Sequence, residues 1–310
     1  DADALLIIGS NPRIEAAVLN SRIRRNWLSS RMPIGVVGPK VDLTYDADFF
    51  GQDPSNLDAI ADGSHKFAVK LKKAKRPMII IGMGAMKRAD GAAMLGKARR
   101  IAEAYGVVAN GWNGFNMLHT AAARVGGLDI GFLPGRGAMD VAAMGKAAKA
   151  GRLDLLWLLG ADEIDFDAFS SSFIVYQGHH GDAGAHHADL VLPGAAYTEK
   201  DGIYVNTEGR VQYSSRAAFP PGEAREDWAI IRAVSGAIGK SIGFDSLIEL
   251  RHSLCSAHPH FADVDQITPA KWSSFGGRAK LSAEPVSYAF RNFYMTCAIS
   301  RASETMAECV

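Results

Sequence analysis

Short apolar runs alternate with amphipathic stretches along most of the chain. Residues 4–8 are wholly apolar and end at Gly9-Ser-Asn-Pro12, which predicts a buried parallel strand followed by a tight turn. Between Ile14 and Trp27, apolar residues recur at helical spacing among arginines, which predicts an amphipathic helix. Strand, turn and helix together make the first half of a β–α–β unit.

This alternation is repeated further along the chain. We expect strands at residues 34–37, 77–81, 107–108, 153–159 and 173–176, and helices at residues 66–75, 89–105, 118–125, 139–150 and 228–238. Residues 110–116, rich in glycine, asparagine and aromatic side chains, are expected to form a loop. Strands and helices that alternate over roughly 240 residues predict an α/β fold with doubly wound, mostly parallel sheets.

The pattern divides the chain into three parts. We predict one α/β lobe at residues 1–137, a second at residues 138–243, and an irregular C-terminal tail at residues 244–310. In the tail the periodicity fades, and proline, serine and aromatic residues are scattered. Residues 287–294 are too aromatic for a disordered linker, so we expect the tail to lie on a protein surface.

Composition and charge narrow the function classes. A chain of 310 residues is long enough for two or three compact units. Its net charge of +1 gives no long-range field that would attract nucleic acid or an acidic membrane, so we expect no nucleic-acid partner. No apolar run approaches the roughly 18 residues that a membrane span needs. We therefore expect membrane association only through partner proteins.

The cysteines argue against a metal cluster in this segment. The three cysteines, Cys255, Cys297 and Cys309, form no Cys-x-x-Cys pair, so neither a disulfide framework nor an iron–sulfur ligand set can be read from their spacing. Unpaired thiols are typical of a reducing compartment, which favours the cytosol or a surface that faces it. Because the chain opens on Asp1 and runs directly into a strand, we expect it to be part of a longer polypeptide.

Two glycine turns are candidates for phosphate binding. Gly9-Ser-Asn-Pro12 and Gly82-Met-Gly84 both follow a strand and open a helix, where free backbone N–H groups could hold a phosphate. The second turn lacks the third glycine of a dinucleotide fingerprint, because Lys87 stands in its place. Such turns are also needed simply to make a tight corner, and we favour this structural interpretation. Nucleotide binding at Gly82 and Gly84 is the alternative.

Histidines and carboxylates form two further groups. His179, His180, His186 and His187 could chelate zinc, but adjacent histidines on a loop point apart and no cysteine accompanies them, so we predict no metal site. Three carboxylates near a glycine turn, Glu199, Asp201 and Glu208, could act as acid or base. No nucleophile stands beside them, so we expect them to fix the backbone and predict no catalytic residue.

Several ordered motifs resemble one superfamily. Gly9-Ser-Asn-Pro12, Gly160-Ala-Asp162 and the long stretch at residues 188–212 resemble the molybdopterin oxidoreductases, such as formate dehydrogenase and DMSO reductase. Narrower motifs resemble the G-type large iron–sulfur subunit of respiratory NADH:quinone oxidoreductase, complex I. These lie at residues 113–116, 118–120, 126–131, 180–182, 292–296, 299–303 and 306–309.

The resemblance implies a fold and a role. It implies the C-terminal, molybdopterin-oxidoreductase-like portion of that subunit, with the three-domain fold of formate dehydrogenase and DMSO reductase. The 4Fe–4S and 2Fe–2S clusters of the family are expected in an N-terminal region, and this segment is expected to hold no cofactor. The pterin-type loops would be vestigial, and their positions here are Gly9, Asn11, Pro12, Gly82, Gly84 and Gly160.

The implied function is structural. The segment would scaffold the electron-input arm of the proton-pumping enzyme, a translocase that passes electrons from NADH to quinone, without catalysis of its own. Its expected partners are the other subunits of the peripheral arm, on the cytoplasmic side of the bacterial inner membrane or the matrix side of the mitochondrial one. The alternative is part of a molybdopterin-dependent oxidoreductase, such as a formate dehydrogenase large subunit, with its catalytic residues upstream.

Overall fold

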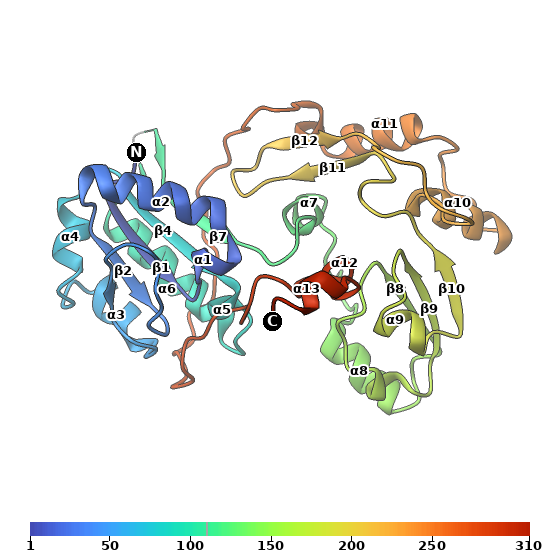
Figure 1. Ribbon diagram of the computed structural model, residues 1–310, viewed down its shortest axis with the longest axis horizontal. Helices are drawn as coiled ribbons and strands as arrows, with labels where there is room; N and C mark the ends of the chain where they lie inside the picture. Colours follow the sequence, from blue (N-terminus) through green and yellow to red (C-terminus); the bar gives the residue numbers. More distant parts are fainter. Residues whose placement is uncertain (110) are drawn as a thin grey trace. The chain divides into compact units, whose positions relative to one another are not determined.

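The chain forms two compact units in a computed structural model that describes residues 1–109 and 111–310 (Figure 1). The first unit comprises Asp1–Ala122 and Pro269–Thr296, and the second comprises Ala123–Thr268 and Cys297–Val310. Position 110, which falls in the loop predicted at residues 110–116, lies outside the described residues. These units differ from the predicted ranges 1–137, 138–243 and 244–310, because the tail is shared between both units. The division into two lobes and a tail with these bounds stays a prediction.

The first unit is built on a five-stranded parallel sheet. Its order is β3-β2-β1-β4-β7, with β1 at Ala4–Ile8, β2 at Ile34–Val37, β3 at Asp48–Phe49, β4 at Pro77–Gly82 and β7 at Phe115–Leu118. From β1 the chain first adds strands on one side and then, with β4, on the other. The sheet is therefore doubly wound, and its topological switch point lies between β1 and β4.

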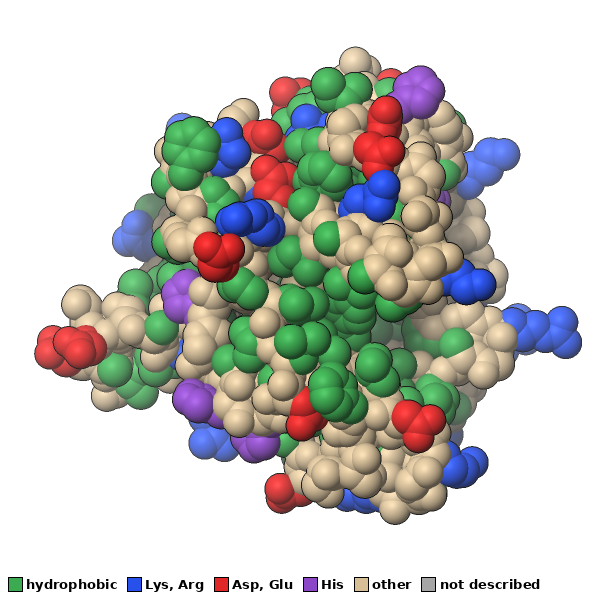
Figure 2. Space-filling model, turned by 90° about the vertical axis from the view of Figure 1, so that its right-hand side faces the viewer, with side chains coloured by type: hydrophobic (Ala, Val, Ile, Leu, Met, Phe, Trp, Pro, Cys, Tyr) green, Lys and Arg blue, Asp and Glu red, His purple; other side chains and the backbone are tan. Residues whose placement is uncertain are grey.

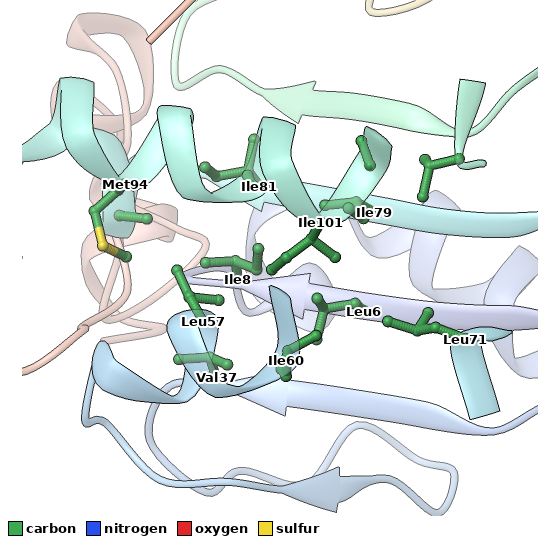
Figure 3. Packing of buried hydrophobic residues seen from close by; sticks show 14 of the residues in the cluster. Leu6, Ile8, Val37, Leu57, Ile60, Leu71, Ile79, Ile81, Met94 and Ile101 are labelled. Atoms are coloured by element: carbon green, nitrogen blue, oxygen red, sulfur yellow. The ribbon is translucent and has the colours of Figure 1, made fainter. Parts of the chain in front are cut away.

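Helices cover both faces of this sheet. They are α1 (Pro12–Glu15), α2 (Ala17–Ser30), α3 (Ser55–Ala61), α4 (Ala68–Lys73), α5 (Met83–Met86) and α6 (Gly91–Ala104), and β5 (Val108–Ala109) pairs with β6 (Trp112–Asn113). Because side chains alternate along a strand, Leu6 and Ile8 belong to one core and Leu5 and Ile7 to the other. Figure 3 shows the first core, in which residues of β1 and β4 point toward α3 and α6.

The second unit contains a three-stranded parallel sheet and a hairpin. The sheet order is β10-β9-β8, with β8 at Leu155–Leu159, β9 at Phe173–Gly178 and β10 at Leu190–Pro193. The hairpin joins β11 (Gly202–Val205) to β12 (Val211–Ser214). Helical segments surround them: α7 (Arg124–Asp129), α8 (Val141–Lys149), η1 (Phe166–Phe169), α9 (Ala183–His187), α10 (Asp227–Ala237), α11 (Leu247–Ala257), η2 (Pro259–Ala262), α12 (Ala298–Arg301) and α13 (Glu304–Ala307).

The expectations for residues 110–125 were wrong, since β6 and the start of β7 lie in the stretch predicted as a loop. The helix predicted at residues 118–125 is absent, since Phe115–Leu118 forms β7 and the helix begins only at Arg124. Phe115 stands opposite Ile79 of the buried strand β4. This pairing makes residues 115–118 a strand although their own preference for strand structure is weak. The tail contains α11 in its first part, which packs Leu254 against the core of the hairpin, and its residues 263–297 form no helix or strand.

No helix in the described part of the chain has both the length and the apolar character needed to cross a membrane.

Candidate functional site

The carboxyl edge of the first sheet brings the two glycine turns together. In doubly wound sheets, ligands bind outside the carboxyl ends of the strands at the switch point. Here that point lies between β1, which Gly9 follows, and β4, which ends at the first residue of Gly82-Met-Gly84. The Gly84 N–H donates a hydrogen bond to the Gly9 carbonyl oxygen at 3.1 Å. The two turns that the sequence singled out therefore form one structure.

Contact between the turns explains their glycines. Gly9 has φ of +60°, and a Cβ there would lie 2.5 Å from the backbone nitrogen of Ala85. A Cβ on Gly82 would lie 2.5 Å from the Gly9 carbonyl oxygen, and one on Gly84 would lie 2.7 Å from the same atom. Real Cβ contacts are longer, so side chains are excluded at all three positions. The close packing of the two turns is enough to explain why glycine stands at these three positions.

The donors of the first turn are already used within the chain. The Ser10 hydroxyl donates to Glu15 Oε2, and the Asn11 N–H donates to Glu15 Oε1, both at 2.9 Å. A carboxylate thus accepts the hydrogen bonds that a phosphate would take. The buried Asn11 Oδ1 has no hydrogen-bond partner among the described residues, but it is an acceptor, and phosphate oxygens are acceptors too. The first turn does not fit a phosphate.

The second turn is covered by the tail. A Cβ on Gly84 would collide with the Ser287 carbonyl oxygen, and a Cβ on Gly38 would lie 2.8 Å from the ring of Tyr288. The space left at this edge is a cavity of about 150 Å³. It is lined by Met83, Gly84, Lys87, Arg88, Glu284, Ser287, Tyr288 and Ala289. Pockets for small molecules and cofactors usually measure roughly 300–1,000 Å³, so the nucleotide arm of a pterin cofactor does not fit here.

The carboxyl edge of the second sheet carries acidic loops that bind an arginine of the same unit. Gly160, with φ of +60°, follows β8 and donates its N–H to the Gln177 carbonyl at 2.7 Å. Arg301 on α12 donates to Asp182 at 2.8 Å, and it also lies within hydrogen-bond distance of Glu163 and Asp162. The hydrogen bond from Arg301 lowers the pKa of the Asp182 carboxyl. An arginine of the chain therefore offsets part of the acidic charge at this edge.

A larger cavity lies at the ends of β9 and β10. Its volume is about 470 Å³, and its lining includes Gly178, His179, His180, Gly194, Glu199 and Glu223. The described lining contains two carboxylates and no lysine or arginine. The nearby Lys200 is already bound to Asp227. Without a cation to offset these carboxylates, the cavity does not fit the pyrophosphate of a dinucleotide.

The four histidines do not converge on one point. His179 and His180 lie after β9 with their Nδ1 atoms 2.6 Å apart, and burial, followed by the charge of His180, lowers the pKa of His179. His187 lies on α9 and stacks on Phe166 with ring centroids 4.2 Å apart. Across the described residues, no group of three or more histidine, cysteine, aspartate or glutamate side chains is placed to hold a metal ion.

Each of the three carboxylates near the glycine turn has a different partner within the chain. Glu199 accepts a hydrogen bond from the Ala196 N–H, and Asp201 accepts one from the Arg216 N–H, both at 2.9 Å. Both carboxylates therefore accept a hydrogen bond from a backbone N–H group. Glu208 differs, since its carboxylate pairs with a neighbouring arginine at 3.5 Å.

Sequence reasoning missed the residues that fill these edges. Glu15 could have been noticed, because it stands four positions after Asn11 in the first turn of a helix, where carboxylates often bind free N–H groups. Arg88, Ser287 and Arg301 gave no such signal, because each contacts residues that are far away in the sequence, such as Glu284 in the case of Arg88.

Two family models match different parts of the chain. The family model described as molybdopterin oxidoreductase matches residues 1–237. The model for the C-terminal part of the G subunit of NADH-ubiquinone oxidoreductase matches residues 266–309.

Curated relatives confirm the resemblance to the large iron–sulfur subunit. The G subunits of NADH-quinone oxidoreductase from Rickettsia felis and Rickettsia conorii are each 44% identical over 309 residues, covering 100% of this chain and 44% of the relative. The NADH-ubiquinone oxidoreductase 75 kDa subunit of Reclinomonas americana is 42% identical over 315 residues, covering 100% of this chain and 45% of the relative. The chain thus spans less than half the length of these relatives.

A solved structure agrees with the predicted fold. Acetylene hydratase from Pelobacter acetylenicus superposes with a TM-score of 0.61 at 13% identity, over 77% of this chain and 48% of that chain. At this identity the likeness concerns the fold alone. Because the molybdopterin oxidoreductase model matches residues 1–237 of the 310, the chain belongs to the molybdopterin oxidoreductase family.

Proposed function

We propose that this chain is a structural part of the electron-input arm of a proton-pumping NADH:quinone oxidoreductase and performs no redox chemistry itself. The similarity over the full chain to the G and 75 kDa subunits supports the assignment to that enzyme. The observation that carries the structural role is the filled carboxyl edge of the first sheet. Glu15 takes the donors of one turn there, and Ser287 covers the other.

The proposal places the redox centres outside this chain. The iron–sulfur clusters, 4Fe–4S and 2Fe–2S, would be held in the part of the longer relatives that this chain does not match. The protein would sit on the cytoplasmic side of a bacterial inner membrane, or on the matrix side of a mitochondrial one. It would be held there by other subunits of the peripheral arm.

One sheet face of the second unit suits such a partner. Leu155, Leu159, Phe173 and Leu190 are 45–52% exposed. The strand register places them on the same face, which also carries the buried Val175 and Gln177. Ile174 on the opposite face is buried in the unit's core. Figure 2 shows hydrophobic side chains gathered in the middle of the face that it presents. Exposed apolar side chains gathered on one face mark protein–protein contacts, so we assign the exposed part of this sheet face to another subunit of the same complex.

Phe173→Asp in the full-length protein tests this assignment. Because Phe173 is 48% exposed, the free energy of unfolding should change by less than about 1 kcal/mol. A charge on a buried interface is costly, however, so the amount of subunit recovered in the membrane-bound complex should fall severalfold. Native electrophoresis of solubilised membranes, stained for NADH oxidation, measures the assembled fraction.

Ile248→Asp is the matched control, because Ile248 is 81% exposed on α11 and lies outside this sheet face. It should assemble like the wild type. Normal assembly of Phe173→Asp would contradict the assigned surface.

A further inference from the structure

The tail crosses the carboxyl edge of the first sheet as a continuous strap. We use this name for residues 282–288. Ser287 lies over Gly84 after β4, and the Tyr288 hydroxyl donates to the Pro39 carbonyl after β2. Between these contacts, the Val286 N–H donates to the Gln52 carbonyl at 2.8 Å. The strap therefore spans the ends of the two strands that flank β1.

A buried ion pair holds the beginning of the strap. Arg88, 7% exposed, donates to both carboxylate oxygens of Asp90, at 2.7 and 2.8 Å. Arg88 also donates to the Ser282 hydroxyl at 2.9 Å and to the Glu284 carbonyl. In return, the Ser282 N–H donates to Asp90 at 2.7 Å. Charge-assisted hydrogen bonds are the strong ones, so this end of the strap is firmly attached.

The middle of the strap is part of the hydrophobic core. Val286 is fully buried and belongs to the same cluster as Ile8 and Ile81, which are the carboxyl-terminal apolar residues of β1 and β4. Withdrawing the strap would open that core to water. The strap is therefore a permanent component of the first unit.

The strap and the sheet that it covers are matched by different family models. The molybdopterin oxidoreductase model ends at residue 237, whereas the G-subunit model matches residues 266–309, which include the strap. The sheet edge is thus shared with the wider family, and its cover comes from the segment that the G-subunit model matches.

We propose that the strap is an internal substitute for the nucleotide arm of the pterin cofactor. It closes the carboxyl edge of the first sheet, and Glu15 occupies the donors beneath it. In doubly wound sheets this edge binds a ligand, whereas here it binds a segment of the same chain. This inference concerns the first unit alone and does not rest on the proposed place in a respiratory complex.

Hydrogen exchange on the whole 310-residue chain tests the substitution. Tyr288→Ala removes the ring that packs on Gly38 and the hydrogen bond to Pro39, which should loosen the strap. Exchange of the Val286 amide should accelerate about tenfold or more, while the Ile7 amide in β1 changes less. Tyr294→Ala is the matched control, since Tyr294 is 38% exposed and lies beyond the strap. It should leave Val286 exchange unchanged.

A second variant and a ligand complete the test. Gly84→Ala should also accelerate Val286 exchange, because the new methyl group pushes the Ser287 carbonyl away. GDP, as a probe for the nucleotide arm, should give no binding heat with the wild type at millimolar concentration. Equal Val286 exchange in Tyr288→Ala, Gly84→Ala and the wild type would overturn the proposal. Binding of GDP to the wild type while Val286 stays protected would overturn it too.

Discussion

Gly9→Ala is expected to destabilise the first unit by about 3 kcal/mol or more, since two costs add. The residue adopts φ of +60°, a conformation that L side chains rarely accept. The added Cβ would also lie 2.5 Å from the backbone nitrogen of Ala85 and 2.8 Å from its Cβ. Neither atom can move away by side-chain rotation, because both belong to Ala85, a buried residue of the short helix α5. Chemical denaturation followed by circular dichroism measures the loss.

Gly51→Ala separates the two costs. Gly51 also has positive φ, +84°, but nothing lies within 4 Å of its added Cβ. This variant should lose only about 1 kcal/mol, the cost of the backbone conformation alone. If both variants lost the same amount, close contact between the glycine turns would not be what requires glycine at position 9.

Arg88→Ala should cost about 3–5 kcal/mol, the range found when one partner of a buried ion pair is removed. The Arg88 side chain is 2% exposed and that of Asp90 is 12% exposed. The substitution leaves the Asp90 charge buried without its partner and removes the donors to Ser282 and Glu284. Arg100→Ala is the control, since Arg100 and its partner Asp62 are 48% and 60% exposed. It should cost less than about 1 kcal/mol in the same unfolding measurement.

The pH dependence of this cost gives an independent check. The hydrogen bond from Arg88 holds the pKa of Asp90 well below its ordinary value of about 3.9. A lowered pKa in the folded state contributes stability that is present above the unfolded pKa and is lost as the pH falls through the folded one. The difference between wild type and Arg88→Ala should therefore be constant from about pH 7 to 5 and shrink below about pH 4. A difference that disappears near neutral pH would contradict the pairing with Asp90.

Strands were predicted correctly where the local sequence pattern and the tertiary environment favour the same structure. Residues 4–8 and 77–81 are apolar, β-branched in part, and followed by glycine, so both were predicted as strands and form β1 and β4. β7 was missed because Phe115–Leu118 contains an asparagine and follows a glycine-rich stretch. Only its position beside β4 makes it a strand, and that position is not encoded in the four residues themselves.

The candidate site was also only partly predictable from the sequence. The turns at Gly9 and Gly82 follow strands directly, so the topology of parallel strands was enough to place them at one edge. The groups that fill the edge come from elsewhere. Arg88 and Glu284 are 196 positions apart, and nothing in either local sequence indicates that they meet. The histidines show the converse, because closeness in sequence at positions 179–187 did not bring them to one point.

Molybdenum analysis of the full-length protein, purified from its natural host, tests the central claim most directly. The claim is that a molybdopterin oxidoreductase fold serves here as a scaffold, with its cofactor edge closed by Glu15 and the strap. Elemental analysis by mass spectrometry, combined with fluorimetric extraction of pterin, should find iron but neither molybdenum nor pterin above background. One molybdenum atom per chain, accompanied by extractable pterin, would contradict the account.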